Sequence, residues 1–415
     1  MNGIPKYEDL AHSWGEPRCP DTLRGVVDET IRDGLQMPYV PALSVAAKCE
    51  FLDHMIASGI SDVIVGMVQR EDAQADLLAL LRHCRQSGAS IQTWILSRLN
   101  STDIEAVLRL RDAAGIDVGA NVFVSLSALR MFVEGWQEQA LLGRLDEGLT
   151  FARRHFSQIR LALEDATRTP PAAIAAASRL AADHRVTRLV IADTAGVAIP
   201  EGVAHIFEFL HTQCPWLRDA QVGLEWHGHN DRGLAIANSL ESIACGAHYV
   251  HGTMLGIGER NGNAALDSIL LNLSSEIDFI RWDPFHAYQQ KCHELFGQHL
   301  KKLYPFFGEY TFASATGTHC AAARKAIERG RSDLSVLLYS PPSVLSRAAR
   351  PRFLLSPMSG RGAALAVLEE MGLTPTPAFV DKLLARVREI NRTIEPAELK
   401  QIVESITPLS RKQSR

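Results

Sequence analysis

The chain has 415 residues, of which 46% are hydrophobic, 22% charged and 7% aromatic, and this composition excludes disordered, collagen-like and coiled-coil proteins. Its 43 Lys and Arg against 47 Asp and Glu leave a net charge of −4, which is too small a balance to indicate a nucleic-acid or membrane partner. The seven cysteines are scattered without a CxxC pair, so we expect neither a disulfide framework nor a zinc finger. The first twenty residues lack an apolar export segment, and no window approaches the roughly 18 apolar residues of a membrane span. These features predict a cytoplasmic protein whose partners bind at a defined site.

Eight short apolar or β-branched runs recur along the first part of the chain, each followed by a longer stretch with helical spacing. Parallel strands need a crossover of that length, so the pattern predicts eight strand–helix units. Eight units close a (β/α)8 TIM barrel, although an open doubly wound sheet is built from the same alternation. The predicted strands are Gly25–Asp28, Asp62–Gly66, Ile91–Leu96, Asp117–Val124, Ile159–Leu163, Arg188–Ala192, Val222–Trp226 and His248–Gly252.

The placement of polar residues favours the barrel over the open sheet. Polar and charged residues stand just beyond the ends of several predicted strands, and barrel enzymes build their sites at that rim from several strands at once. These segments are Glu29–Asp33, Glu164-Asp165, Asp193-Thr194, His227–Asn230 and Gly258–Arg260.

The region after the eighth unit reads as a mainly helical C-terminal extension broken by prolines. We expect a linker at 281–284, because Pro284 discourages helix continuation. A helix over 379–390 carries an apolar stripe that must be buried against the barrel or a sister subunit. The expected organisation is an N-terminal arm over 1–20, a catalytic barrel over 21–280, a linker with helical subdomains over 281–409, and a flexible tail over 410–415.

A metal site is indicated by the pair His227 and His229, which point to the same side of the seventh strand because they are two residues apart. Read alone, the pair is equally typical of structural histidines. Asp33 after the first strand and Asn263 after the eighth strand favour a metal, because strands one, seven and eight adjoin in a closed barrel. Two imidazoles, a carboxylate and an amide oxygen suit Mg, Mn, Co or catalytic Zn. The remaining coordination positions suit a bidentate 2-oxo acid, whose carbonyl the metal would polarise.

Three long motifs, at 28–36, 225–234 and 256–263, resemble the isopropylmalate/homocitrate synthase family of the DRE-TIM metallolyases. The resemblance continues more weakly through 316–319 and 359–361. It implies a metal-dependent Claisen condensation of acetyl-CoA with a 2-oxo acid, followed by thioester hydrolysis. The product would be a 2-alkylmalate or a homocitrate-type acid.

The resemblance also assigns roles around the metal. By position, Asp33, His227, His229 and Asn263 resemble the metal ligands. Arg32 resembles the arginine beside the metal-bound carbonyl, where a guanidinium stabilises the developing alkoxide; the alternative is a surface arginine paired with Glu29. Gln36 and Thr194 would bind the substrate carboxylate, or would instead cap local turns.

The general base implied by the resemblance is His319, reaching the barrel of the partner subunit in a homodimer and assisted by Glu164. The alternative for His319 is a buried helix histidine. Ser125 and Arg160 correspond to positions that contact the far part of the 2-oxo acid, although Arg160 could instead be a solvent-facing partner of an acid. Exposed polar selectors such as Arg160 would favour a dicarboxylic substrate.

Some positions depart from the family pattern. Ile64 stands where relatives commonly carry a glutamate, and Ile64 with Met67 would favour an alkyl or aryl substrate. The motif at 32–36 also resembles hydroxymethylglutaryl-CoA lyases, but the loop 256–260 lacks the cysteine of those retro-aldol enzymes. A non-catalytic binding protein is a further alternative, disfavoured because all four ligand positions are retained. The sequence ends near the point where a leucine-responsive regulatory domain would begin, so we expect no leucine feedback.

Overall fold

The computed structural model describes residues 6–12, 15, 19–37, 42–68, 71–296, 304–308, 310–340 and 349–406. The chain divides into two compact units, one comprising 16–298 and the other 1–15 with 299–415. The predicted tail at 410–415 lies outside the described residues. Within the described part of the chain, no helix combines the length and apolarity needed to cross a membrane.

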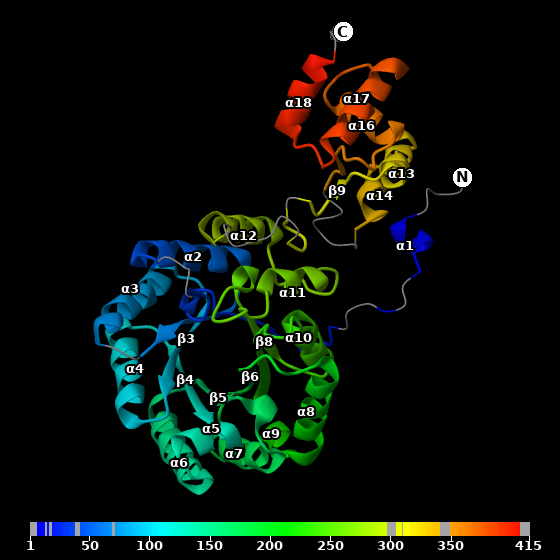
Figure 1. The fold of residues 1–415 in the computed structure, drawn as a ribbon. Helices are drawn as coiled ribbons and strands as arrows, with labels where there is room; N and C mark the ends of the chain where they lie inside the picture. The colour runs from blue at the N-terminus through cyan, green and yellow to red at the C-terminus, as the bar shows by residue number, and fades with distance from the viewer. Residues whose placement is uncertain are drawn as a thin grey trace. The chain divides into compact units, whose positions relative to one another are not determined.

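The larger unit is a closed barrel of eight parallel strands in sequence order, with β1 hydrogen-bonded to both β2 and β8 (Figure 1). The prediction of a (β/α)8 barrel is therefore confirmed, and the open-sheet alternative is excluded. Each observed strand begins within one residue of its predicted start, because buried β-branched runs mark the strands of a parallel sheet. The strands are β1 Gly25–Asp28, β2 Asp62–Met67, β3 Gln92–Arg98, β4 Val118–Ser125, β5 Ile159–Glu164, β6 Arg188–Asp193, β7 Gly223–Gly228 and β8 Tyr249–Gly252.

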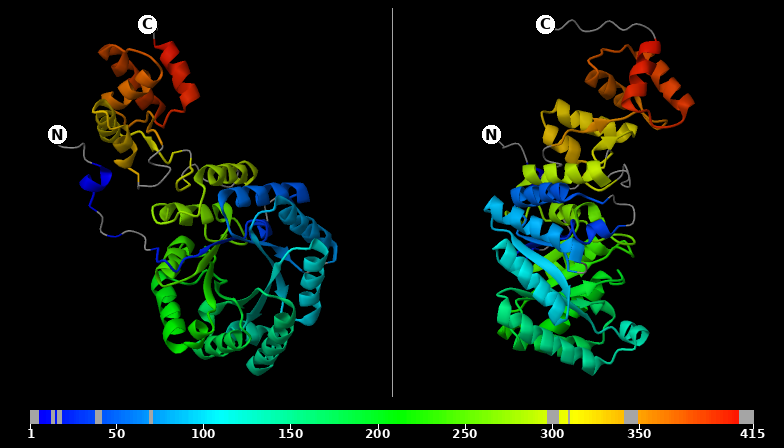
Figure 2. Two further views of the ribbon diagram at one scale, coloured as in Figure 1. Left: turned by 180° about the vertical axis from the view of Figure 1, so that it is seen from behind. Right: turned by 90° about the vertical axis from the view of Figure 1, so that its left-hand side faces the viewer.

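Helices surround the ring of strands and cover its outer face (Figures 1 and 2). Local sequence sets their ends: in α4 the side chain of Asn100 accepts a hydrogen bond from the Asp103 amide, and Gly115 ends the helix at φ 68°. The helices of this unit are α2 Val45–Ser58, α3 Glu71–Ser87, α4 Ser101–Ala114, α5 Ala128–Glu134, α6 Glu138–His155, α7 Pro171–Asp183, α8 Pro200–Gln213, α9 Trp216–Asp219, α10 Ala235–Ala244, α11 Leu266–Asn272 and α12 Trp282–Phe296.

The segment expected to be a linker at 281–284 is instead the start of α12. Pro284 lies in the first turn of this helix, where its missing N–H leaves no hydrogen bond unmade. The helix packs along α2, with Phe51 stacked near Phe296, and the hydroxyl of Tyr288 donates to Asp28 of β1. The barrel unit consequently extends to Gln298, beyond the expected boundary at residue 280.

The smaller unit has its own core of buried side chains from α13, α16, α17 and α18. The apolar stripe of α17 is buried in this core, so the surface that covers it lies within the same unit. A two-stranded parallel sheet pairs β9 with β10. The elements here are α1 Tyr7–Leu10, β9 Ala313–Ser314, α13 Gly317–Glu328, α14 Ser332–Leu337, β10 Arg352–Phe353, α16 Arg361–Glu370, α17 Pro377–Ile390 and α18 Pro396–Ser405.

Candidate active site

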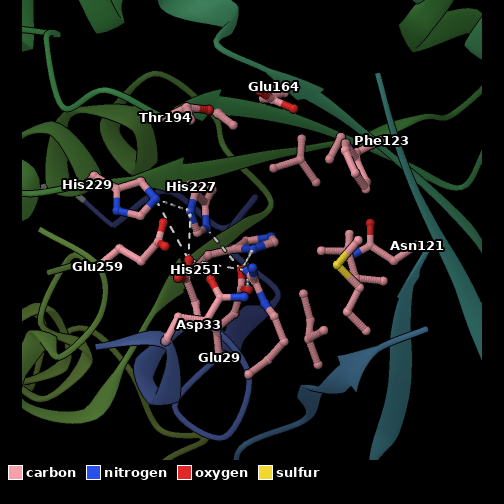
Figure 3. Close-up of a pocket in the computed structure, with 18 of the residues that line it drawn as sticks. Glu29, Asp33, Asn121, Phe123, Glu164, Thr194, His227, His229, His251 and Glu259 are labelled. Carbon is pink, nitrogen blue, oxygen red and sulfur yellow. Dashed lines mark hydrogen bonds and ion pairs between the residues drawn. The ribbon is translucent and has the colours of Figure 1, made fainter. Parts of the chain in front are cut away.

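A cavity of about 300 Å³ opens at the carboxyl end of the barrel strands. That volume is at the lower end of the range for small-molecule sites, about 300 to 1,000 Å³. Residues of all eight strands, or of the loops that follow them, line it, and Figure 3 shows a number of them. The cavity is lined by Glu29, Arg32, Asp33, Gln36, Ile64, Met67, Leu96, Asn121, Phe123, Ala162, Glu164, Val190, Ala192, Thr194, His227, His229, His251, Glu259 and Arg260.

The loop after β1 places Arg32 and Asp33 in the cavity. At the end of the strand, the Asp28 carboxylate accepts a hydrogen bond from the Thr30 amide at 2.7 Å. Arg32 forms a close ion pair with Glu29, and its Nη2 lies 3.4 Å from Asp33 Oδ2. Arg32 therefore does pair with Glu29, as the alternative of a surface arginine expected. Its side chain, however, lines the cavity and is only 13% exposed, so it is not a surface residue.

His227 and His229 extend from the end of β7 toward Asp33. Their Nε2 atoms lie 3.3 Å apart, and Asp33 Oδ2 lies 3.6 Å from the first and 3.8 Å from the second. The three residues are 3% to 9% exposed. Ligand atoms that share one metal ion at about 2.1 Å lie roughly 3 Å apart when adjacent, so the observed spacing is close to that of a metal site.

The protonation state of the two histidines leaves lone pairs free for a metal. Burial lowers the pKa of His227 to about 3 and that of His229 to about 4, so both imidazoles are neutral at pH 7. His227 Nδ1 lies 3.0 Å from Glu29 Oε1, and a proton on that nitrogen leaves the lone pair of Nε2 facing Asp33. Burial opposes ionisation of Asp33, but neighbouring positive charge, chiefly Arg32, holds its pKa below the ordinary value.

Asn263 is brought beside the histidines by backbone pairing between the ends of β7 and the loop after β8. His229 and Asn263 form an antiparallel bridge, and the Ala264 amide donates to the Gly228 carbonyl. The Asn263 side chain is 2% exposed, and its Oδ1 has no hydrogen-bond partner among the described residues. A buried amide oxygen without a hydrogen bond, next to two imidazoles and a carboxylate, is a donor set that suits a divalent cation.

The other predicted substrate contacts are divided between two cavities. Gln36 and Thr194 line the central cavity. Thr194 Oγ1 also accepts a hydrogen bond from the Asp165 amide at 2.8 Å, so Thr194 has a local structural contact like the turn cap given as its alternative role. Glu164 lines the same cavity, and burial raises the pKa of its carboxyl group. Ser125 lies instead in a neighbouring cavity of about 670 Å³, where its hydroxyl donates to the Glu164 carbonyl at 3.3 Å.

Arg160 requires a correction, because it contacts neither the cavity nor solvent. It is the second residue of β5 and therefore lies toward the amino end of the strand, away from the rim. Its side chain is fully buried, pairs with Glu225 at 2.7 Å and lies over the Trp94 ring at 3.9 Å. Arg160 is thus a core residue, neither a substrate selector nor a solvent-facing ion-pair partner.

Behind His227 lies a buried network of hydrogen-bonded side chains that was not predicted from the sequence. His251 of β8 joins two carboxylates, with Nδ1 2.6 Å from Glu29 Oε1 and Nε2 2.9 Å from Glu225 Oε2. Glu225 in turn pairs with Arg160 and Arg188. Alternation on β7 could have identified Glu225, because it is two residues before His227 and faces the same side.

His319 lies in the smaller compact unit, in the first turn of α13. It is exposed, and its ring stacks on Tyr339 with 4.0 Å between centroids. The alternative of a buried helix histidine is therefore wrong, and Cys320, the next residue, takes the buried position instead.

The chain is similar to known proteins in sequence and in fold. The chain is 29% identical over 378 residues to a Methanopyrus kandleri protein described as a probable 2-isopropylmalate synthase, covering 89% of this chain and 70% of that protein. It is 27% identical over 395 residues to the homocitrate synthase of Saccharolobus solfataricus, covering 92% and 80%. The solved HMG-CoA lyase of Bacillus subtilis has a TM-score of 0.55 at 19% identity, covering 66% of this chain and 94% of that one, and shares the fold.

The family match coincides with the structural unit that holds the cavity. Residues 25–287 match the HMGL-like family, from the start of β1 into α12. This segment includes Arg32, Asp33, both cavity histidines and Asn263, and it spans more than half of the chain. The chain therefore belongs to the HMGL-like family.

Proposed function

We propose that this protein is a metal-dependent acyltransferase that condenses acetyl-CoA with a 2-oxo acid and then hydrolyses the thioester to release CoA. The observation that carries the proposal is the convergence of Asp33, His227 and His229 beside Arg32 in one cavity. The names of the relatives, 2-isopropylmalate and homocitrate synthases, support a reaction of this kind.

Four side chains would hold the cofactor: Asp33, His227, His229 and Asn263. The mixed nitrogen and oxygen donors suit Mg, Mn, Co or Zn. When bound, the ion supplies Lewis-acid polarisation of the 2-oxo acid carbonyl. Glu29 orients His227 for this purpose by accepting a hydrogen bond from its Nδ1–H.

Substrate orientation and charge stabilisation fall to neighbouring residues. Gln36 and Thr194 hydrogen-bond the carboxylate of the 2-oxo acid at the rim of the cavity. Arg32 is fixed by its pairs with Glu29 and Asp33, and it stabilises the negative charge that develops on the carbonyl oxygen as the carbon–carbon bond forms. A preorganised cation is among the largest contributions to this type of catalysis.

Proton transfer is assigned to His319 and Glu164. A base must remove a proton from the acetyl methyl group so that this carbon can attack the carbonyl carbon of the 2-oxo acid. We assign this step to His319, supplied by the partner subunit of a homodimer, with assistance from Glu164. The proton taken by His319 is returned to the alkoxide that the new bond leaves on the former carbonyl oxygen. Water then attacks the thioester carbonyl and displaces CoA as the thiol, so the products are the hydroxy diacid and CoA.

A second candidate is a retro-aldol lyase of hydroxyacyl-CoA substrates. The likeness of the barrel to HMG-CoA lyases favours it only at the level of the fold. The loop Gly256–Arg260 carries no cysteine, and no cysteine lines the described cavity, so that a lyase would need another proton relay.

A thiol-release assay separates the two reactions. Purified protein with Mg, Mn, Co or Zn is incubated with acetyl-CoA and a panel of 2-oxo acids, and free CoA is measured. We expect CoA release that depends on both the metal and a 2-oxo acid. If none of the 2-oxo acids in the panel supports CoA release and the protein cleaves hydroxymethylglutaryl-CoA, the synthase is contradicted and the lyase is supported.

A further inference from the structure

The two sides of the central cavity differ in chemistry. One side holds the histidines, Asp33 and Glu259, and Figure 3 shows Asn121 and Phe123 on the opposite side. That opposite wall is built by strands β2 to β6, whose side chains in the cavity are apolar apart from Asn121 and Glu164, the last residue of β5. Its apolar members are Ile64, Met67, Leu96, Phe123, Ala162, Val190 and Ala192.

Positive charge is confined to the polar side among the described residues that line the cavity. Arg32 pairs with Glu29 and Asp33. Arg260 pairs with Asp231 at 2.9 Å and donates to the Thr194 carbonyl at 2.7 Å. Arg160, the cation that would have suited a second substrate carboxylate, is buried elsewhere against Glu225.

Asn121 is the uncharged polar group of this wall. It lies on β4, opposite Leu96 of β3, and it is 2% exposed. Its Oδ1 has no hydrogen-bond partner among the described residues, although it borders the cavity. A neutral amide in this position can bind an uncharged group, but one hydrogen bond does not offset the desolvation of a full carboxylate charge.

We propose that the cavity selects 2-oxo acids with an uncharged, mainly apolar side chain and rejects 2-oxo dicarboxylic acids. The inference rests on the proposed function, since it takes the 2-oxo acid headgroup to bind at the polar side. The side chain then extends over Ile64 and Phe123 toward Asn121. A second carboxylate in that place would lose its water and meet no cation among the described lining residues.

Pairs of substrates with equal shape test this selection. 4-Methyl-2-oxopentanoate matches oxaloacetate atom for atom in its heavy-atom skeleton, and 5-methyl-2-oxohexanoate matches 2-oxoglutarate. We expect kcat/KM for CoA release to be at least about 100-fold higher for the branched member of at least one pair. A dicarboxylate that equals or exceeds its branched partner in both pairs would overturn the inference.

Two variants of one wall position sharpen the test. Ala162 lies opposite Phe123 in the β4–β5 register and borders the cavity. Ala162→Lys adds a cation to the apolar wall, and Ala162→Met adds similar length without charge. We expect the ratio of dicarboxylate to branched-acid kcat/KM to rise at least about tenfold in the first variant relative to the second. Equal ratios in the two variants would contradict the role assigned to the wall.

Binding without acetyl-CoA distinguishes failure of this inference from failure of the proposed reaction. With MnCl2 present, the branched acids should raise the melting temperature more than their dicarboxylate counterparts. If no acid supports CoA release but this difference persists, the synthase reaction is wrong and the selection stands. If the dicarboxylates stabilise the protein equally well or better, or if no acid stabilises it, the selection is wrong.

Discussion

At the scale of single residues, Glu29 contacts several side chains of the cavity and holds them in position. Its Oε1 lies 3.0 Å from His227 Nδ1 and 2.6 Å from His251 Nδ1, while its Oε2 pairs closely with Arg32. One buried carboxylate thus orients a proposed metal ligand and the proposed oxyanion-stabilising group together. Residues that hold metal ligands in this way tune affinity without touching the ion.

Glu29→Gln should weaken metal binding about 10- to 100-fold, because the amide removes the charge that holds the His227 proton on Nδ1. Mn²⁺ affinity can be measured by calorimetric titration. Glu259→Gln is the matched control, since Glu259 lines the same cavity and its nearest ion-pair partner is Arg260 at 3.9 Å. Equal affinities in the two variants would contradict the role assigned to Glu29.

At the scale of elements, α12 is joined to the barrel by a hydrogen bond to one buried acid. Asp28 ends β1 and receives hydrogen bonds from the Thr30 amide and from the Tyr288 hydroxyl of α12. Burial raises its pKa from 3.8 to about 6. The folded protein therefore binds this proton more tightly than the unfolded chain does, and ionisation of Asp28 destabilises the fold as pH rises from about 4 through 6.

Asp28→Asn should remove this pH dependence. As pH rises from 4 to 7, the unsubstituted protein should lose up to roughly 3 kcal/mol of unfolding free energy that the variant keeps. Urea unfolding at the two pH values measures the change, with exposed Asp112→Asn as the control. If the difference in stability between Asp28→Asn and the unsubstituted protein is the same at both pH values, the assignment is wrong.

The loop after β8 depends on backbone geometry that an L side chain disfavours. Gly262 has φ +84°, and a Cβ at this position would collide with the Gly256 carbonyl oxygen. Gly262→Ala should destabilise the protein by more than about 2 kcal/mol and lower its metal affinity, because Asn263 is the next residue. Gly233→Ala is the control: its φ is +73° with nothing within 4 Å of the added carbon, so a loss of about 1 kcal/mol is expected. Unfolding and Mn²⁺ titration of both variants measure the effect, and equal losses would contradict it.

The strands were predictable because each combines apolar residues with a helical stretch behind it, as in β6 from Arg188 to Asp193. The start of α12 was not, because proline is read as a helix breaker and its tolerance in a first turn depends on where the helix begins. Arg160 was misplaced for a related reason. Whether an inward residue faces the rim or the barrel interior depends on its height along the strand, and Arg160 stands at the amino end.

Considered as a whole molecule, the chain carries its proposed catalytic groups on two compact units. Arg32 and the metal-ligand candidates belong to the unit 16–298, whereas His319 belongs to the other unit. The sequence motifs predicted both sets, because each motif is local. Local patterns do not report how folded units associate, so the proposed homodimer depends on a functional test.

Complementation between inactive variants provides that test. Arg32→Gln and His319→Ala should each lose most of the CoA-release activity. If His319 acts on the partner's cavity, subunit exchange forms dimers with one intact site, and statistical mixing should restore about a quarter of the original activity. Size-exclusion chromatography verifies the dimer, and Arg32→Gln mixed with Asp33→Asn is the control that should restore nothing. No recovery with His319→Ala would contradict a shared site.

The most direct test of the account is the metal content of the protein. After dialysis against a chelator and then against Mn²⁺, the unsubstituted protein should retain about one ion per chain by elemental analysis, and Asp33→Asn should retain at most a small fraction of that. Asp231→Asn, which removes a nearby carboxylate paired with Arg260, should retain the full amount. Equal retention by Asp33→Asn, or no retained ion in the unsubstituted protein, would contradict the proposal that Asp33, His227, His229 and Asn263 hold one cation.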